Sequence, residues 1–219
     1  MTTAAEVETA LHADLAAEIL RDWRQAVADD VERDPYSPDE ISAMAVAWDE
    51  AEVPYGSTLL LTVMAGRWLG CLQIGDGDVL LLTPDGNASL PVPSDPSLDG
   101  VRTTSLCQPN ALQSFREAVH DLETEPLLAV LLVTDGYGNA QLADPWHPGV
   151  GADLARMLRH EGPDWVAERL PEWAQLCASS EGSADDTTMA LIVSRGEATP
   201  GGAPGSVPAS QARTVTESS

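Results

Sequence analysis

The sequence predicts an α+β domain over about residues 1–195, in which a mostly antiparallel sheet is flanked by helices. Three features support this prediction. Apolar residues recur with a helical period near the N-terminus, apolar runs broken by hairpin turns follow, and two amphipathic segments precede a last apolar run. Hydrophobic residues make up 43% of the 219 residues, so the chain can build a buried core.

The N-terminal third is predicted to be helical. Apolar residues recur at every fourth position from Val7 to Val31, which predicts one long amphipathic helix that ends before Pro35. A second helix is expected over 37–48, because this segment begins with a Ser-Pro pair, the N-cap and first-turn residues that helices favour. Two more helices are expected nearer the C-terminus, at 151–160 and 163–177.

The middle of the chain is predicted to form strands. A meander of three or four antiparallel strands is expected within 55–92, because short apolar runs there alternate with hairpin turn sequences such as Gly75-Asp76-Gly77. Residues 92–110 are rich in Pro, Ser and Asp, which predicts a loop. Further strands are expected at 115–122, 127–134 and 188–193.

The charge of the chain excludes one class of partner. Its 35 acidic and 11 basic residues give a net charge of −24. A surface this negative repels the phosphate backbone of DNA and RNA. We therefore expect no nucleic-acid partner. A negative surface favours solubility, and a cluster of acids within it can attract divalent cations.

Membrane association and export are not expected either. No apolar stretch approaches the ~20 residues that a membrane span requires. The first residues lack the basic flank and apolar centre of a signal peptide. The three cysteines are widely spaced and form no CxxC pair, which indicates a reducing compartment. We therefore expect a cytoplasmic protein that does not bind membranes.

Three aspartates share one sequence context, the junction of an apolar strand with a turn: Asp76, Asp135 and Asp185. Carboxylates at strand ends can converge on one edge of a sheet, and Mg²⁺ and Mn²⁺ bind such oxygen ligands. The alternative is that each carboxylate only accepts hydrogen bonds from its own turn, which Gly136 and Gly138 predict after Asp135. We expect the Asp135 and Asp185 carboxylates to lie within ~10 Å of each other, the reach of one ion or one water bridge.

Four motifs follow one another along the chain: "YGSTLLLTVM", "IGDGDVLLLTPDG", "LLVTDGYGN" and "DDTTMALIV". In this order they resemble the protein phosphatase 2C family of metal-dependent Ser/Thr phosphatases. The segments "TTSLCQP" at 103–109 and "PDWVAERLPEWAQL" at 163–176 are similar to the bacterial branch of this family. The resemblance covers about residues 15–195.

The resemblance implies a sandwich of two antiparallel β-sheets with helices outside (α/β/β/α) and a site for two Mn²⁺ or Mg²⁺ ions at one edge. The implied activity, part of bacterial signalling, is hydrolysis of phosphoserine and phosphothreonine in a phosphorylated protein substrate by a metal-activated water. Asp135 and Asp185 match metal-binding aspartates of the family. Asp76 matches an aspartate that in some members helps hold a third, weaker metal. Gly77-Asp78 replaces the Ser-Arg that usually follows it, and Asn139 stands where another aspartate is frequent.

The family's N-terminal strands have no counterpart in the sequence. Those strands carry the arginine that helps bind phosphate and an Asp-Gly-x-Gly motif whose aspartate bridges both metals. We therefore expect residues 1–195 to be an N-terminally truncated phosphatase domain with impaired activity, and a start codon assigned too late explains the loss. The alternative is a catalytically inactive binding or regulatory module.

Residues 196–219 are expected to be a disordered tail. They are rich in Gly, Pro, Ala, Ser and Thr, and apolar residues there are too few to offset the entropy of ordering the chain. Deleting this tail should leave the melting temperature unchanged, as measured by differential scanning calorimetry. A clear drop in the melting temperature would show that the tail docks on the domain.

Overall fold

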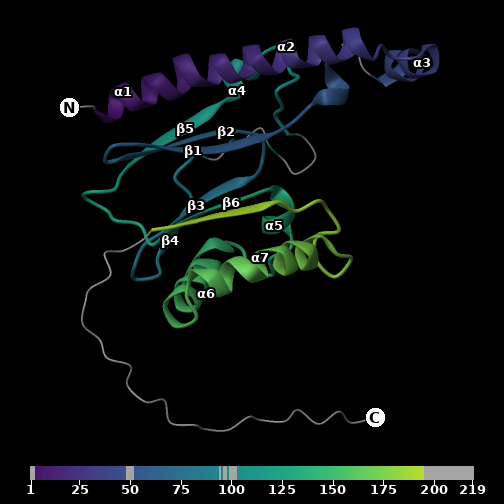
Figure 1. The fold of residues 1–219 in the computed structure, drawn as a ribbon. Coiled ribbons are helices and arrows are strands. Elements are labelled where there is room, and N and C mark those ends of the chain that lie inside the picture. The colour runs from purple at the N-terminus through teal and green to yellow at the C-terminus, as the bar shows by residue number, and fades with distance from the viewer. Residues whose placement is uncertain (1–2, 48–51, 94, 96–97, 99–102, 195–219) are drawn as a thin grey trace, which may run out of the picture.

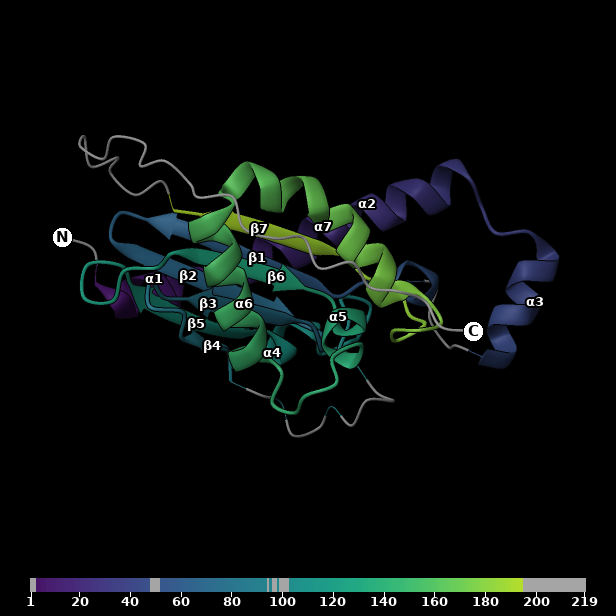
Figure 2. The same cartoon turned by 90° about the horizontal axis from the view of Figure 1, so that it is seen from below.

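The structure, a computed structural model, describes residues 3–47, 52–93, 95, 98 and 103–194. Two antiparallel sheets stack face to face, with long helices on both outer faces (Figures 1 and 2). The predicted two-sheet sandwich flanked by helices is therefore confirmed. The end of the second predicted helix at Trp48, part of the 92–110 loop and the tail at 196–219 lie outside the described residues.

Four strands form within 55–92, as predicted, but β2 and β3 lie in different sheets. The hairpin expected at Gly75-Asp76-Gly77 is therefore wrong, because the chain crosses there from one sheet to the other. The first sheet has the order β1–β2–β5, and the second has the order β4–β3–β6–β7. Every neighbouring pair is antiparallel. The strands are β1 (Leu59–Ala65), β2 (Trp68–Ile74), β3 (Asp78–Leu82), β4 (Ala88–Ser89), β5 (Arg116–Asp121), β6 (Ala129–Val133) and β7 (Met189–Val193).

The predicted N-terminal helix contains a π-helical segment. It comprises α1 (Ala4–Thr9), π-helix η1 (Ala10–Ala16) and α2 (Ala17–Arg33), with helical backbone angles at the junctions. An apolar repeat of four residues exceeds the 3.6 residues of an α-helical turn, and the wider π turn helps keep the repeat on one face. The other helices are α3 (Pro38–Ala47), 3₁₀-helix η2 (Val53–Tyr55), α4 (Ala111–Ser114), α5 (Asp135–Asn139), α6 (His147–His160) and α7 (Pro163–Ala178).

The helices cover opposite faces of the sandwich. Helix α1 and η1 lie on the first sheet, against β2 and β5, while α6 and α7 lie on the second sheet, against β3, β4 and β7 (Figure 1). Among the described residues, no helix is both long enough and apolar enough to cross a membrane.

Strand β3 is buried on both faces, which explains its continuous apolar sequence. Val79 and Leu81 belong to the cluster between the two sheets, whereas Leu80 and Leu82 belong to the cluster beneath α6 and α7. Successive side chains of a strand point to opposite faces, so a strand covered on both sides needs apolar residues at every position. The uninterrupted run thus follows from the position of β3 in the middle of the structure.

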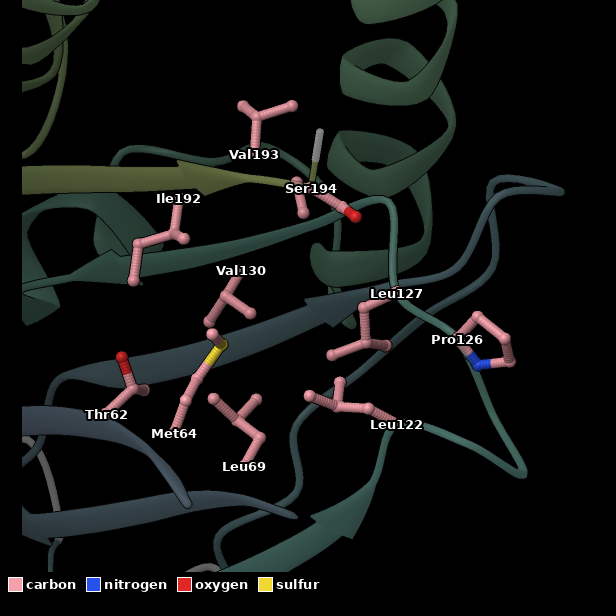
Figure 3. A pocket seen from close by; sticks show the side chains of 11 residues that line it. Thr62, Met64, Leu69, Leu122, Pro126, Leu127, Val130, Ile192, Val193 and Ser194 are labelled. Atoms are coloured by element: carbon pink, nitrogen blue, oxygen red, sulfur yellow. The ribbon is translucent and has the colours of Figure 1, made fainter. Parts of the chain in front are cut away.

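An apolar groove lies where the two sheets meet along one side. Strands β1 and β7 are the outer strands of their sheets among the described residues, and side chains of both line a pocket of about 380 Å³ (Figure 3). Met64 of β1 is 69% exposed and Ile192 of β7 is 48% exposed. Both strands contribute apolar side chains to this groove, which is separate from the acidic residues singled out in the sequence.

Truncating one buried leucine of the core should strongly lower the free energy of unfolding. Leu72 of β2 is fully buried beneath the N-terminal helix, so Leu72→Ala should lower the free energy of unfolding by about 2–5 kcal/mol in urea denaturation. Leu142 is fully exposed, so Leu142→Ala should change the free energy of unfolding by less than about 0.5 kcal/mol. Equal effects of the two substitutions would contradict the described core.

An ion pair joins the β1–β2 hairpin to the end of β5. The Nε of Arg67 donates to Asp121 Oδ1 at 2.8 Å, and this arginine lowers the pKa of Asp121 to about 2. The backbone N–H of Glu123 also donates to Asp121. A depressed pKa in the folded state means that the stabilisation is present above the ordinary pKa of aspartate, about 3.9, and is lost as the pH falls towards 2.

Asp121→Asn should therefore be less stable than the wild type at pH 6, and the difference should disappear near pH 2. Thermal unfolding followed by circular dichroism across this range measures it. A difference that does not change with pH would show that the charge of Asp121 contributes nothing.

Candidate metal centre

The three predicted acids lie at the same edge of the second sheet. Asp78 of β3 pairs with Val133 of β6, which in turn pairs with Met189 of β7. These three residues form one row across the sheet, where the chain enters β3, leaves β6 and enters β7. Each predicted acid lies within four residues of this row. They are Asp76 in the β2–β3 turn, Asp135 at the start of α5 and Asp185 in the α7–β7 loop.

The segments of Asp135 and Asp185 are in direct contact. The Oγ1 of Thr134 accepts a hydrogen bond from the Thr188 N–H at 2.9 Å and donates one to the Asp186 carbonyl at 3.3 Å. The Thr134 N–H donates to the Thr188 carbonyl at 3.1 Å. Residues fifty positions apart in the sequence thus lie side by side.

Glycine at position 136 permits this contact. A Cβ atom there would lie 2.7 Å from the Asp186 carbonyl oxygen and 2.8 Å from Thr187 Oγ1. The glycine-rich turn expected after Asp135 is, however, a short helix, α5. The expectation of a turn was wrong because the glycines serve close packing here, and neither Gly136 nor Gly138 has a positive φ.

Asp76 and Asp135 line one pocket of about 530 Å³, together with Asp78, Asn139 and Arg116. The apolar walls of the pocket include Leu90, Val92, Pro93 and Leu98. Asp185 is not among the lining residues, but its charge acts on Asp135. The structure therefore brings two of the three predicted acids into one pocket and places the third beside it.

Burial and neighbouring charges raise the pKa of two aspartates at this edge, Asp78 and Asp135. Burial raises the pKa of Asp135, and the nearby charges of Asp76 and Asp185 raise it further. Burial likewise raises the pKa of Asp78, and the charges of Asp76 and Asp135 add to this shift, whereas Arg116 and His147 oppose it. Ionised carboxylates in such a group repel each other, and a bound cation relieves that repulsion.

The acids at this edge offer a cation only a partial set of ligands. Within the described part of the chain, no three His, Cys, Asp or Glu side chains are grouped closely enough to hold a metal ion by themselves. A protein can nevertheless bind Mg²⁺ through one or two carboxylates while water fills the other coordination positions. Asp76 and Asp135 supply such a pair, with Asp185 close by.

Sequence reasoning missed four polar residues of this pocket. They are Gln73, Asp78, Asp95 and Arg116. Asp78 follows Asp76 by two positions, so its proximity was available from the sequence. Arg116 begins β5, and only the pairing of β5 with β2 brings it to this edge.

Solved structures similar to this chain are bacterial phosphatases. A bacterial serine phosphatase with a single point mutation has a TM-score of 0.54 and 15% identity, covering 89% of this chain and 70% of that chain. A second such variant has a TM-score of 0.50 and 12% identity, covering 87% and 70%. The catalytic domain of the serine/threonine phosphatase PstP, in complex with two manganese ions, has a TM-score of 0.43 and 19% identity, covering 80% and 79%. At these identities the first two structures support the fold alone.

The sequence comparison is more specific. No curated protein matches the chain significantly. The model of the protein phosphatase 2C family matches residues 1–175, which is most of the sequence. This match contains three of the four motifs and ends before the fourth, at 185–193. It confirms the family resemblance, and the chain therefore belongs to the protein phosphatase 2C family.

Proposed function

We propose that the chain hydrolyses phosphoserine and phosphothreonine in a phosphorylated protein, using Mn²⁺ or Mg²⁺ held by Asp76 and Asp135, with Asp185 beside them. The observation that supports this proposal is the meeting of these strand-end acids at one edge, beside a pocket of about 530 Å³. Membership of the phosphatase family supports the reaction class.

The charges of the pocket make a cation necessary for this reaction. A phosphate monoester carries about two negative charges at neutral pH, and Asp76, Asp78 and Asp135 repel it. When bound, the cation supplies the positive charge that attracts the phosphoryl group and lowers the pKa of the attacking water. The carboxylates hold and orient this ion, and Arg116 is the basic residue among the described lining residues.

The walls of the pocket fit a protein substrate. Leu90, Val92 and Leu98 also line it and supply apolar surface that the residues flanking a phosphorylated serine or threonine can contact. Because no three described acids surround one point, metal binding should be weak and turnover slow. This agrees with the impaired activity expected from the sequence.

A second candidate is a catalytically inactive module that binds phosphoproteins or regulates a partner. The lack of a closed three-acid group among the described residues favours it. The two candidates differ in a single measurement, which is metal-dependent turnover.

The test is hydrolysis of p-nitrophenyl phosphate by the full chain in the presence of Mn²⁺. Activity should appear with Mn²⁺ and be lost with EDTA, and Asp135→Asn should lower the rate by at least about 100-fold, since it removes a ligand. Asp153 is an exposed acid of α6 that pairs with Arg156, so Asp153→Asn is a matched control and should retain the wild-type rate.

Activity that survives both EDTA and Asp135→Asn would contradict the proposed metal site. A folded wild type that binds phosphopeptide but shows no turnover with either metal would support the inactive module instead.

A further inference from the structure

The turn that carries Asp76 is held by contacts with segments distant in the sequence. Gly75 has φ +108°, a left-handed conformation that glycine adopts without strain. The Gly75 N–H donates to Thr104 Oγ1 at 2.9 Å. A Cβ on Gly77 would lie 2.6 Å from the Val133 carbonyl, so the turn fits tightly against the end of β6, two residues before Asp135.

Gln73 binds both carbonyls that flank Asp76. Its Nε2 donates to the Gly75 carbonyl at 3.3 Å and also to the Gly77 carbonyl. Gln73 is only 3% exposed, and it is the one buried polar side chain in the described core. An amide in this position is costly unless it is hydrogen-bonded, so these two bonds account for its presence in the strand.

Arg116 reaches the same turn from the neighbouring strand. Gln73 of β2 and Arg116 of β5 are register partners, so their side chains lie on the same face of the sheet. Arg116 Nη2 donates to the Gly75 carbonyl that Gln73 also binds, and Nη1 donates to the Pro93 carbonyl at 2.7 Å. The guanidinium thus joins the Asp76 turn to the opposite wall of the pocket.

The environment of Arg116 disfavours its positive charge. Burial lowers the pKa of Arg116, and the charges of Asp95, Asp78 and Asp76 oppose that shift. Its Nε is buried and has no hydrogen-bond partner among the described residues. Both terminal nitrogens, by contrast, have backbone carbonyl partners, so the arrangement favours holding the backbone over pairing with an acid.

We infer that Gln73 and Arg116 form a clamp on the Gly75–Gly77 turn that positions the Asp76 carboxylate, relative to Asp135, for binding a divalent cation. This inference rests on the proposed function. Both are positioning residues, since they contact the backbone of the turn and not the ion. The clamp also explains why a basic residue lies in a site built to attract cations.

Arg116→Lys tests the clamp because it keeps the charge and removes the forked donor. Isothermal titration of Mn²⁺ into the full chain should show an affinity about tenfold weaker than that of the wild type, as for loss of a group that orients a ligand. Gln73→Met, which removes the amide without changing the charge, should weaken Mn²⁺ binding similarly. Arg159 also donates to a backbone carbonyl, that of Pro84 at 2.7 Å, so Arg159→Lys is the control and should bind normally.

A second measurement does not depend on the metal. Amide hydrogen exchange of Gly75, measured by NMR without added Mn²⁺, should be faster in Arg116→Lys than in Arg159→Lys, because the turn loses one of its restraints.

The outcomes separate the clamp from the proposed function. Wild-type Mn²⁺ affinity in folded Arg116→Lys and Gln73→Met would overturn the clamp and leave the metal site intact. Tighter Mn²⁺ binding by Arg116→Gln, with normal binding by Arg116→Lys, would overturn it too, since Arg116 would then act only as an opposing charge. A wild-type chain that binds no Mn²⁺ would overturn the proposed function and the clamp together.

Discussion

The antiparallel pairing of β3, β6 and β7 determines where every acid of the candidate site lies. Asp78, Val133 and Met189 form one row across the three strands. The chain enters β3 and β7 and leaves β6 at this row, so the adjoining segments share one edge of the sheet. A register shift of one residue would turn the apolar side chains of β3 to the wrong faces, so the core that buries them also fixes the acids.

The grouped acids at this edge are disfavoured by folding and are held together by uncharged contacts. Burial and neighbouring carboxylates raise the pKa of Asp135 and Asp78, so folding makes their ionised forms less favourable than in an exposed position. The segments that carry these acids are joined by uncharged hydrogen bonds, such as those of the Thr134 hydroxyl with the Asp186 carbonyl and the Thr188 N–H. The charges can therefore be grouped because the segments that carry them are held by uncharged contacts.

Much of this arrangement could be predicted from the sequence. The apolar runs predict β3, β6 and β7 because each is short, continuous and bounded by turn residues, and the acids at their ends predict a shared edge. The π-helical segment Ala10–Ala16 could not be predicted, because the same four-residue repeat also suits a regular amphipathic helix. The clamp was also hidden, since Gln73 looks like an ordinary strand residue until its register partner Arg116 is known. Local sequence patterns predict helices and strands, whereas the pairing of strands distant in the sequence determines which side chains come into contact.

Gly136 has a consequence for how this family diverges. The Asp186 carbonyl leaves no room for a side chain at position 136, whatever reaction the protein performs, so packing alone retains the glycine. Packing gives no such reason for Asp135, whose ionised form is disfavoured by burial and by the charges of Asp76 and Asp185. A relative that abandons catalysis would therefore keep the glycine and replace the acid before it. In an Asp-Gly pair of this kind, the aspartate indicates whether the chemistry is present, and the glycine indicates only that the fold is packed in this way.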